Sequence, residues 1–223
     1  MDKEFSNLNK RIISALILIP AILILIHIGG FLYNSFVITT AILLTIEILS
    51  LFHKAEKLDL LKNHIIYAII YIALPTASLI SLRSLPEGID IIIYVLVVVW
   101  ITDSLAYFGG KNFQGPKLAE SISPNKTISG AMCGILATII FSAISYFFTS
   151  NVNFFLFIFI GISLSIISQI GDLFESWVKR KLEVKDSGNL IPGHGGICDR
   201  VDGLLFVLPV AYFIFGFLNQ NIF

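Results

Sequence analysis

The chain has 223 residues, of which 56% are hydrophobic and only 13% are charged, and its mean hydropathy is +0.88. Lys plus Arg and Asp plus Glu number 15 each, so the net charge is zero. Soluble domains carry about 25% charged residues, and disordered chains combine low hydrophobicity with high net charge, so neither class fits. A nucleic-acid binder that relies on bulk positive charge is also excluded. Two cysteines cannot build a disulfide framework or a Cys-rich zinc site. A polytopic membrane protein remains.

Apolar stretches follow one another along the chain. They consist mostly of Ile, Leu, Val and Phe, and they have no polar face repeating every 3.6 residues or so, which is typical of helices in lipid or in a buried bundle. They are too long and too uniform for the strands of a membrane barrel. We therefore expect an all-α, polytopic membrane helix bundle of about seven transmembrane helices, near residues 12–28, 31–51, 65–82, 89–108, 129–149, 154–174 and 201–218.

The basic residues predict the orientation of these helices. Short cytoplasmic loops are enriched in Lys and Arg. If the N-terminus is cytoplasmic, all but Arg83 of the 15 Lys and Arg residues fall on the cytoplasmic side. We therefore expect a cytoplasmic N-terminus, an odd number of spans and an external C-terminus. Two long cytoplasmic loops, 109–128 and 175–200, are rich in Gly, Pro, Ser and Lys, residue types that form turns and bind phosphate.

Acidic residues lie toward the predicted cytoplasmic ends of the spans. Acids are costly in hydrocarbon and by default indicate function. Asp199 and Asp202 are three positions apart and would share a helix face, as would Asp172 and Glu175. Clusters of carboxylate oxygens suit Mg²⁺, which takes one or two carboxylates together with substrate phosphates. The sequence therefore predicts a Mg²⁺ site, with a second cation as an option.

A plainer interpretation stays open for each acid, because a carboxylate near the headgroups can simply pair with a neighbouring Lys or Arg. For Glu47, which has no partner motif, we favour that plainer interpretation. For Asp172, Asp199 and Asp202 taken together, beside five basic residues, we favour the metal site. Asp103 is a further acid at the end of a span.

Basic residues of the same segments are candidates for phosphate binding, since Lys and Arg donate charged hydrogen bonds to phosphate oxygens. Gly193, Gly195 and Gly196 would let the backbone approach a phosphate closely. The positive-inside rule also accounts for the number of cations, and His194 between these glycines could be structural. The candidate cations are Lys126, Lys179, Arg180, Lys185 and Arg200.

The stretch 176–202 resembles the signature of the phosphatidate cytidylyltransferases, also called CDP-diacylglycerol synthases. An Asp-Ser-x-Ala-Tyr element at 103–107 and a Ser-Pro-x-Lys-Thr-x-x-Gly element at 123–130 are similar to the same family, as is Gly171–Asp172. The resemblance covers about residues 98–210. The matching signature positions are Ser176, Lys179, Arg180, Lys185, Asp186, Gly188, Pro192, His194, Gly195, Gly196, Asp199, Arg200 and Asp202.

This resemblance implies transfer of the cytidylyl group of CTP to phosphatidate with Mg²⁺. It implies an enzyme of phospholipid biosynthesis in the cell inner membrane, with its active site on the cytoplasmic face. Expected partners are CTP, phosphatidate and membrane lipids, without nucleic acid, and a homodimer is a further option. We treat 1–223 as one integral membrane domain, with N-terminal hydrophobic helices over 1–90 and a catalytic part over 91–218.

The residue roles follow from the motif matches. The expected principal metal ligands are Asp172 and Asp199, with Asp202 and Asp103 in support. The expected catalytic set is Asp172, Asp199, Asp202, Lys185, Asp186 and His194, and the expected substrate-binding set is Ser123, Lys126, Thr127, Lys179, Arg180, Gly195, Gly196 and Arg200.

Two alternatives remain. Another CTP-dependent membrane lipid kinase would need similar cationic loops. A transporter would also carry intramembrane acids, but it predicts them near the bilayer midplane together with Gly- or Pro-broken helices.

Overall fold

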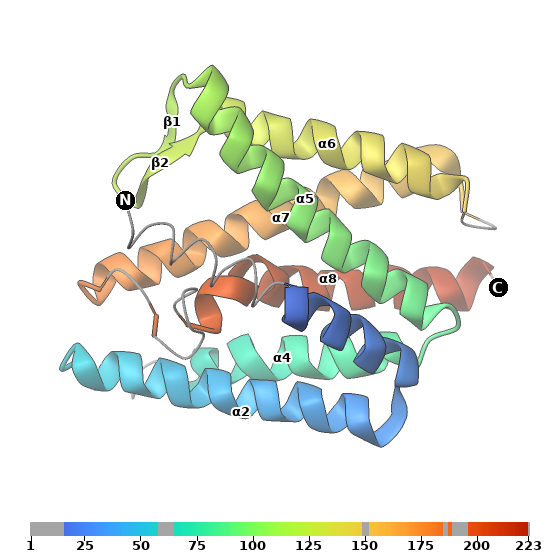
Figure 1. Cartoon of the computed structure of the whole chain (residues 1–223), viewed down its shortest axis with the longest axis horizontal. Helices are drawn as coiled ribbons and strands as arrows, with labels where there is room; N and C mark the ends of the chain where they lie inside the picture. Colours follow the sequence, from blue (N-terminus) through green and yellow to red (C-terminus); the bar gives the residue numbers. More distant parts are fainter. Residues whose placement is uncertain (1–15, 58–64, 149–151, 185–186, 189–195, 223) are drawn as a thin grey trace.

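The computed structural model describes residues 16–57, 65–148, 152–184, 187–188 and 196–222. These residues form a bundle of helices with one small hairpin (Figure 1). The helices are Leu16–Ile28, α2 (Gly30–Lys54), α4 (Ile65–Arg83), α5 (Gly88–Phe113), α6 (Ile128–Tyr146), α7 (Phe154–Lys181) and α8 (Cys198–Ile222), and the strands are β1 (Lys117–Ala119) and β2 (Ser123–Thr127). Every apolar stretch expected to span is helical where it is described, except that α6 ends at Tyr146 and residues 147–148 of the expected span 129–149 form a turn. The all-α membrane bundle is confirmed.

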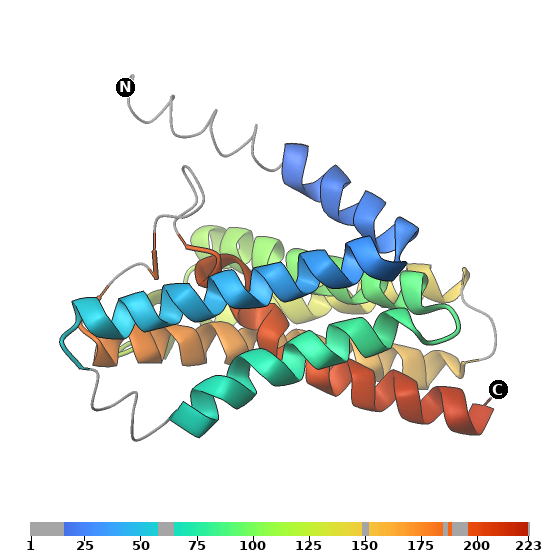
Figure 2. The same ribbon diagram turned by 90° about the horizontal axis from the view of Figure 1, so that it is seen from below.

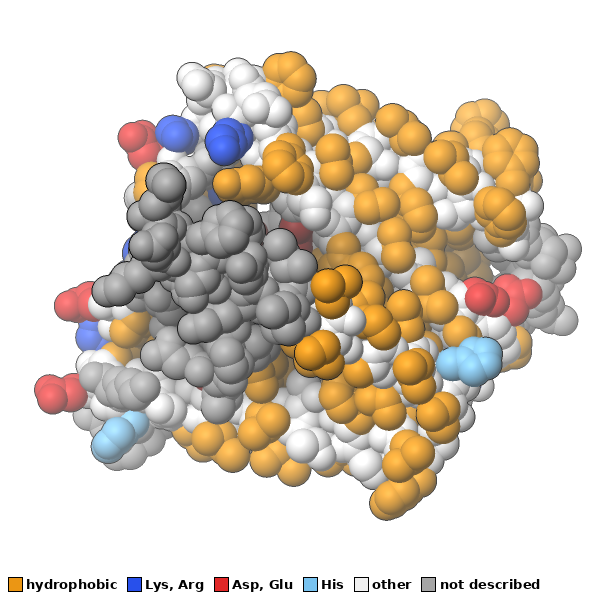
Figure 3. Space-filling view, viewed as in Figure 1, with side chains coloured by type: hydrophobic (Ala, Val, Ile, Leu, Met, Phe, Trp, Pro, Cys, Tyr) orange, Lys and Arg blue, Asp and Glu red, His pale blue; other side chains and the backbone are white. Residues whose placement is uncertain are grey.

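Length and composition make five of these helices long and apolar enough to cross a membrane: α2, α5, α6, α7 and α8. Two shorter apolar helices accompany them, Leu16–Ile28 and the part Tyr67–Arg83 of α4. The total of seven spans stays a prediction. In Figure 3, hydrophobic side chains cover most of the right-hand part of the face, and charged side chains lie toward its left and right edges. Large exposed Ile, Leu and Phe side chains on these helices fit contact with lipid.

One end of the bundle collects the segments expected to be cytoplasmic. Helices α2, α5 and α7 end there, α6 and α8 begin there, and the hairpin lies beside them, toward the left of Figure 1. The Lys57 ammonium of the segment after α2 lies 2.7 Å from Glu183 Oε1 and donates to the Lys181 carbonyl at 2.9 Å, which ties the ends of α2 and α7 together. The hydrogen bond and charge of Lys57 lower the pKa of Glu183.

The two predicted loops are shorter than expected. Helix α5 runs on to Phe113 and ends where Gln114 and Gly115 take positive φ angles of 52° and 107°, which are not helical. The antiparallel hairpin then pairs Lys117 with Thr127 and Ala119 with Ser123. Likewise α7 extends to Lys181 and α8 starts at Cys198, so both loops are partly regular structure.

Close backbone contacts set the spacing of the helices that carry the acids. A Cβ on Gly134 of α6 would lie 2.9 Å from the Thr102 carbonyl oxygen of α5, and one on Gly171 of α7 would lie 2.9 Å from the Asp202 carbonyl oxygen of α8. Small residues allow such approach in membrane bundles. Beside Gly134, the Thr102 hydroxyl bonds to Thr138 at 3.0 Å and to Ser165 at 2.9 Å, joining α5, α6 and α7.

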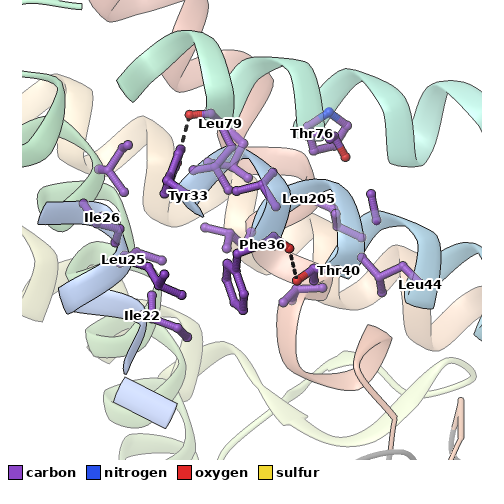
Figure 4. A pocket seen from close by; sticks show the side chains of 18 residues that line it. Ile22, Leu25, Ile26, Tyr33, Phe36, Thr40, Leu44, Thr76, Leu79 and Leu205 are labelled. Atoms are coloured by element: carbon purple, nitrogen blue, oxygen red, sulfur yellow. Dashed lines mark hydrogen bonds between the residues drawn. The ribbon is translucent and has the colours of Figure 1, made fainter. Parts of the chain in front are cut away.

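An apolar cavity of about 150 Å³ lies between Leu16–Ile28, α2, α4, α5 and α8 (Figure 4). The Tyr33 hydroxyl on its wall donates to the Leu79 carbonyl at 3.0 Å, and the Thr40 hydroxyl donates to the Phe36 carbonyl at 2.9 Å. The Thr76 hydroxyl, the third in the lining, donates to the Ile72 carbonyl at 2.6 Å. Because all three hydroxyls are used within the protein, the cavity offers a ligand an almost wholly apolar surface. It is therefore no site for phosphate. Figure 2 shows that the helix Leu16–Ile28 and α2 meet at one end and diverge from that point.

Candidate active site

Three carboxylates from three helices lie near one lysine at the polar end of the bundle. Asp103 of α5 and Asp202 of α8 are both within electrostatic range of Asp172 of α7. The Lys126 ammonium of β2 lies 2.5 Å from Asp172 Oδ2, and both side chains are partly exposed, at 27% and 33%. Asp202 Oδ1 also accepts a hydrogen bond from the Gly203 amide at 2.7 Å. We call Asp103, Asp172, Asp202 and Lys126 the acid–lysine cluster.

The backbone explains why these side chains meet. Gly171 and Gly203 bring α7 and α8 together next to Asp172 and Asp202: a Cβ on Gly171 would lie 3.1 Å from the Gly203 Cα. Lys126 is placed by the hairpin and by the start of α6, where the Thr127 hydroxyl accepts from the Gly130 amide at 3.1 Å. That bond satisfies one of the free amides of the first helical turn.

The hairpin contains three of the expected substrate-binding residues, Ser123, Lys126 and Thr127. Thr127 is 6% exposed and caps α6, so its hydroxyl is engaged within the fold. Ser123 pairs with Ala119 in the sheet. Arg180 of α7 donates from Nε to the Ile122 carbonyl at 3.2 Å, which fastens the hairpin to α7. Lys126 is the expected substrate-binding residue of the hairpin for which an ion pair with one of the acids is described.

A second group of charges surrounds Asp199. The Lys179 ammonium lies 2.7 Å from Glu175 Oε2 and 2.8 Å from Asp199 Oδ1. Asp199 also accepts from the Ser187 amide at 3.1 Å and from the Gly196 amide at 3.0 Å. Its carboxylate is therefore held by one ammonium and two backbone amides.

The sequence brought Asp172 and Asp199 together as principal metal ligands, and the structure gives them different neighbours. Asp172 and Asp202 belong to the acid–lysine cluster, whereas Asp199 binds Lys179 and the backbone. Glu175 is within electrostatic range of both Asp199 and Asp202, so it lies between the two groups. Among the residues that the structure describes, no three His, Cys, Asp or Glu side chains are arranged to hold a metal ion on their own.

The remaining expected residues stand as follows. Gly196 is buried, and its amide faces Asp199, while Arg200 is exposed in the first turn of α8. Lys185, Asp186, His194 and Gly195 lie outside the described residues, so their expected roles stay predictions.

Glu47 is the residue that sequence reasoning misjudged. It is buried, with 3% of its surface exposed, and it accepts hydrogen bonds from Ser187, Ile197 and Cys198 of the signature segment. The expected pairing with a headgroup-level cation is wrong. The sequence did contain a signal for the importance of Glu47, because it is a lone acid near the predicted cytoplasmic end of an apolar span.

Comparison with known proteins places this geometry in a family. A model of the cytidylyltransferase family matches residues 61–218, from before α4 to the last turns of α8. The phosphatidate cytidylyltransferase of Rickettsia bellii is 37% identical over 225 residues, which cover 96% of this chain and 94% of that protein.

Further relatives carry the same name. The Rickettsia felis protein is 34% identical over 96% of this chain and 95% of its own length. The Bacillus subtilis protein is 44% identical over 149 residues, which are 66% of this chain and 55% of that protein. The chain therefore belongs to the cytidylyltransferase family, among relatives that are phosphatidate cytidylyltransferases.

Proposed function

We propose that the chain transfers the cytidylyl group of CTP to phosphatidate, giving CDP-diacylglycerol and diphosphate, and that the acid–lysine cluster is where the phosphates meet. The observation that carries this proposal is the Lys126–Asp172 ion pair with Asp103 and Asp202 beside it, at the polar end of an apolar bundle. The family membership supports the choice of CTP and phosphatidate as substrates.

The location suits a reaction between a lipid and a nucleotide. The phosphate of phosphatidate lies at the membrane surface, and CTP is cytosolic, so the site must open at the cytoplasmic leaflet. The bundle supports this arrangement, because its polar end holds the described Lys and Arg residues other than Arg83. We infer an inner-membrane enzyme with a cytoplasmic active site.

The proposed chemistry needs positioning more than acid–base catalysis. A phosphate monoester has a second pKa of about 6, so a phosphatidate oxygen is largely ionised at neutral pH and can attack without a strong base. That oxygen bonds to the α-phosphorus of CTP while the bond from the α-phosphorus to the bridging oxygen breaks, and its electron pair leaves with diphosphate. Lys126 and Arg200 would neutralise phosphate charge and hold the two anions in line.

The acid–lysine cluster fits a divalent cation by its donor chemistry. Three carboxylates surround one ammonium and offer more oxygens than Lys126 pairs with, and carboxylate oxygens are what Mg²⁺ prefers. Asp172 and Asp202 would hold the ion, with Asp103 in support and substrate phosphates completing the ligand set. When bound, the ion supplies a Lewis acid that neutralises charge on the reacting phosphates.

The decisive test is product formation by the purified protein. In detergent, with CTP labelled in the cytosine ring, phosphatidate and Mg²⁺, we expect a lipid-soluble cytidine product and released diphosphate. Asp172→Asn and Asp202→Asn should each lower its rate by at least about a hundredfold, because each removes a charge on which the reaction depends. Asp90→Asn, at the opposite end of α5 and exposed, is the matched control and should retain the rate.

The same assay separates the rival reaction. A CTP-dependent lipid kinase would transfer the γ-phosphate and leave the labelled cytosine in water-soluble CDP. Absence of labelled lipid in the presence of phosphatidate, or full activity of both aspartate variants at saturating Mg²⁺, would contradict the proposal.

A further inference from the structure

Glu47 lies in the C-terminal part of α2, within the first 60 residues, which precede the family match at residue 61. Only 3% of its surface is exposed. A buried carboxylate is costly unless its oxygens are fully hydrogen-bonded. The fold therefore has to provide donors for it, and those donors come from the signature segment, about 140 residues later in the chain.

Three donors converge on the Glu47 carboxylate. The Ile197 amide donates to Oε2 at 2.8 Å, the Cys198 amide donates to Oε1 at 3.1 Å, and the Ser187 hydroxyl donates to Oε1. Ile197 and Cys198 stand at the beginning of α8, where amides have no partner within the helix and the dipole favours an anion. Glu47 thus takes the anion position at the N-terminus of α8.

Two glycines leave the space that this carboxylate occupies. A Cβ on Gly188 would lie 3.1 Å from the Glu47 carboxyl carbon, and a Cβ on Gly196 would fall on both Glu47 and Ser187. The signature segment is therefore shaped around Glu47 on both sides of residues 189–195. Asp199 meets the same two stretches through the Ser187 and Gly196 amides, so two carboxylates hold one piece of backbone.

We propose that Glu47 is a positioning residue of the active site: by anchoring Ser187 and the start of α8, it sets where Asp199 and Asp202 stand. Its catalytic consequence rests on the proposed function, whereas the anchoring itself does not. The N-terminal half of the chain then contributes to the reaction through α2, although no group of α2 is assigned a contact with substrate.

The anchoring is tested without turnover, through Cys198. This thiol is 5% exposed, and its own amide is one of the Glu47 donors. In a Cys133→Ala background, N-ethylmaleimide should label Cys198 slowly. Glu47→Gln keeps the shape but turns an amide NH₂ toward a backbone donor, so labelling should accelerate about tenfold to a hundredfold, as expected for losing a charged hydrogen bond. Labelling is followed by mass spectrometry.

Two further variants make the result specific. Ser187→Ala removes one donor without touching the charge and should accelerate labelling less than Glu47→Gln does. Combining it with Glu47→Gln should give less than the product of the two effects, because both changes remove the same contact. Thr45→Val is the matched control on α2: its exposed hydroxyl bonds only to the Ala41 carbonyl of its own helix, so labelling should stay at the wild-type rate.

The catalytic consequence is measured by comparing the change in kcat with the change in KM for CTP. Glu47→Gln should lower kcat about tenfold or more with KM for CTP changed less, because substrate-binding cations remain while the acids are misplaced. Unchanged labelling of Cys198 in Glu47→Gln would overturn the anchoring, as would equal acceleration in Thr45→Val. Faster labelling with an unchanged kcat would overturn the positioning role. Faster labelling in a chain that makes no labelled lipid would instead leave the anchor standing and refute the proposed reaction.

Discussion

Two aspartates of the site have surroundings so different that they should respond differently to the same substitution. Asp172 is partly exposed and forms an ion pair with Lys126. Asp199 is held by Lys179 and by the amides of Ser187 and Gly196. The first arrangement leaves oxygens for a ligand, whereas the second uses them to hold the fold.

We therefore expect Asp199→Asn to lower stability as well as activity. An asparagine amide would face backbone donors, and losing charge-assisted hydrogen bonds costs roughly 1.5–3 kcal/mol, or about 3–10 °C in Tm for a chain of this size. Asp172→Asn loses one ion pair between partly exposed side chains, and Asp103 still lies near Lys126, so its Tm should fall less than that of Asp199→Asn while turnover falls at least about a hundredfold. Thermal unfolding in detergent, with the cytidine-lipid assay on the same samples, measures both. Equal Tm values for the two variants would count against the distinction.

The sequence predicted those contacts of the site that join residues three or four positions apart on one helix. Lys179 and Glu175 share a helix face four positions apart, and the spacing of Asp199 and Asp202 could be read in the same way. Glu47 could not be paired with Ser187 or Cys198, because no periodicity connects residues so far apart in the chain. Long-range contacts of a buried carboxylate depend on how whole helices pack.

At the scale of elements, glycines decide how closely the acid-bearing helices approach. A Cβ on Gly130 of α6 would lie 2.5 Å from the Ala106 carbonyl oxygen and 3.1 Å from the Gly110 amide nitrogen of α5. These are backbone atoms, which cannot rotate away as a side chain can. Gly130 also donates its amide to the Thr127 cap, next to Lys126.

Gly130→Ala should therefore push α5 and α6 apart and cost roughly 1–3 kcal/mol, the usual range for overpacking. Activity should fall as well, since Lys126 precedes the displaced helix start. Gly216→Ala in α8 is the matched control, because the nearest atom to its Cβ would be Tyr212 Cε2 at 3.9 Å. Tm and kcat/KM of the two variants compare them directly. If Gly130→Ala were as stable as Gly216→Ala, α5 and α6 could separate without loss of stability, and the prediction would be wrong.

The elements themselves were predictable to different degrees. Apolar spans are visible because hydropathy is a property of neighbouring residues, and the expected spans are helical where described, apart from the turn at residues 147–148. The hairpin was not predicted, because β1 and β2 are short and polar and lack an alternating apolar pattern. The continuation of α5 and α7 past their apolar stretches was missed for a related reason: polar residues at a helix end give no hydropathy signal.

At the scale of the whole molecule, the bundle has two unlike ends. The C-termini of helices α2, α5 and α7 lie at the end that holds the hairpin, the acid–lysine cluster and nearly all described Lys and Arg residues. The opposite end holds Arg83, which donates to the Ile26 carbonyl at 2.7 Å. A charge asymmetry of this kind orients a membrane protein, since segments rich in Lys and Arg stay on the cytoplasmic side.

Single cysteines at the two ends test this orientation. In a chain with Cys133→Ala and Cys198→Ala, we introduce Glu120→Cys in the exposed hairpin turn, or Ser84→Cys in the exposed turn after α4. A membrane-impermeant maleimide should label Ser84→Cys in right-side-out vesicles and Glu120→Cys only in inverted or permeabilised ones, because moving the basic end across the bilayer is opposed by its charges. Labelled CTP added outside should likewise be used by inverted vesicles only, since the nucleotide cannot cross the membrane. Labelling of Glu120→Cys in sealed right-side-out vesicles would place the acid–lysine cluster on the external face, where no cytosolic nucleotide could reach it, and would refute the orientation and the proposed leaflet together.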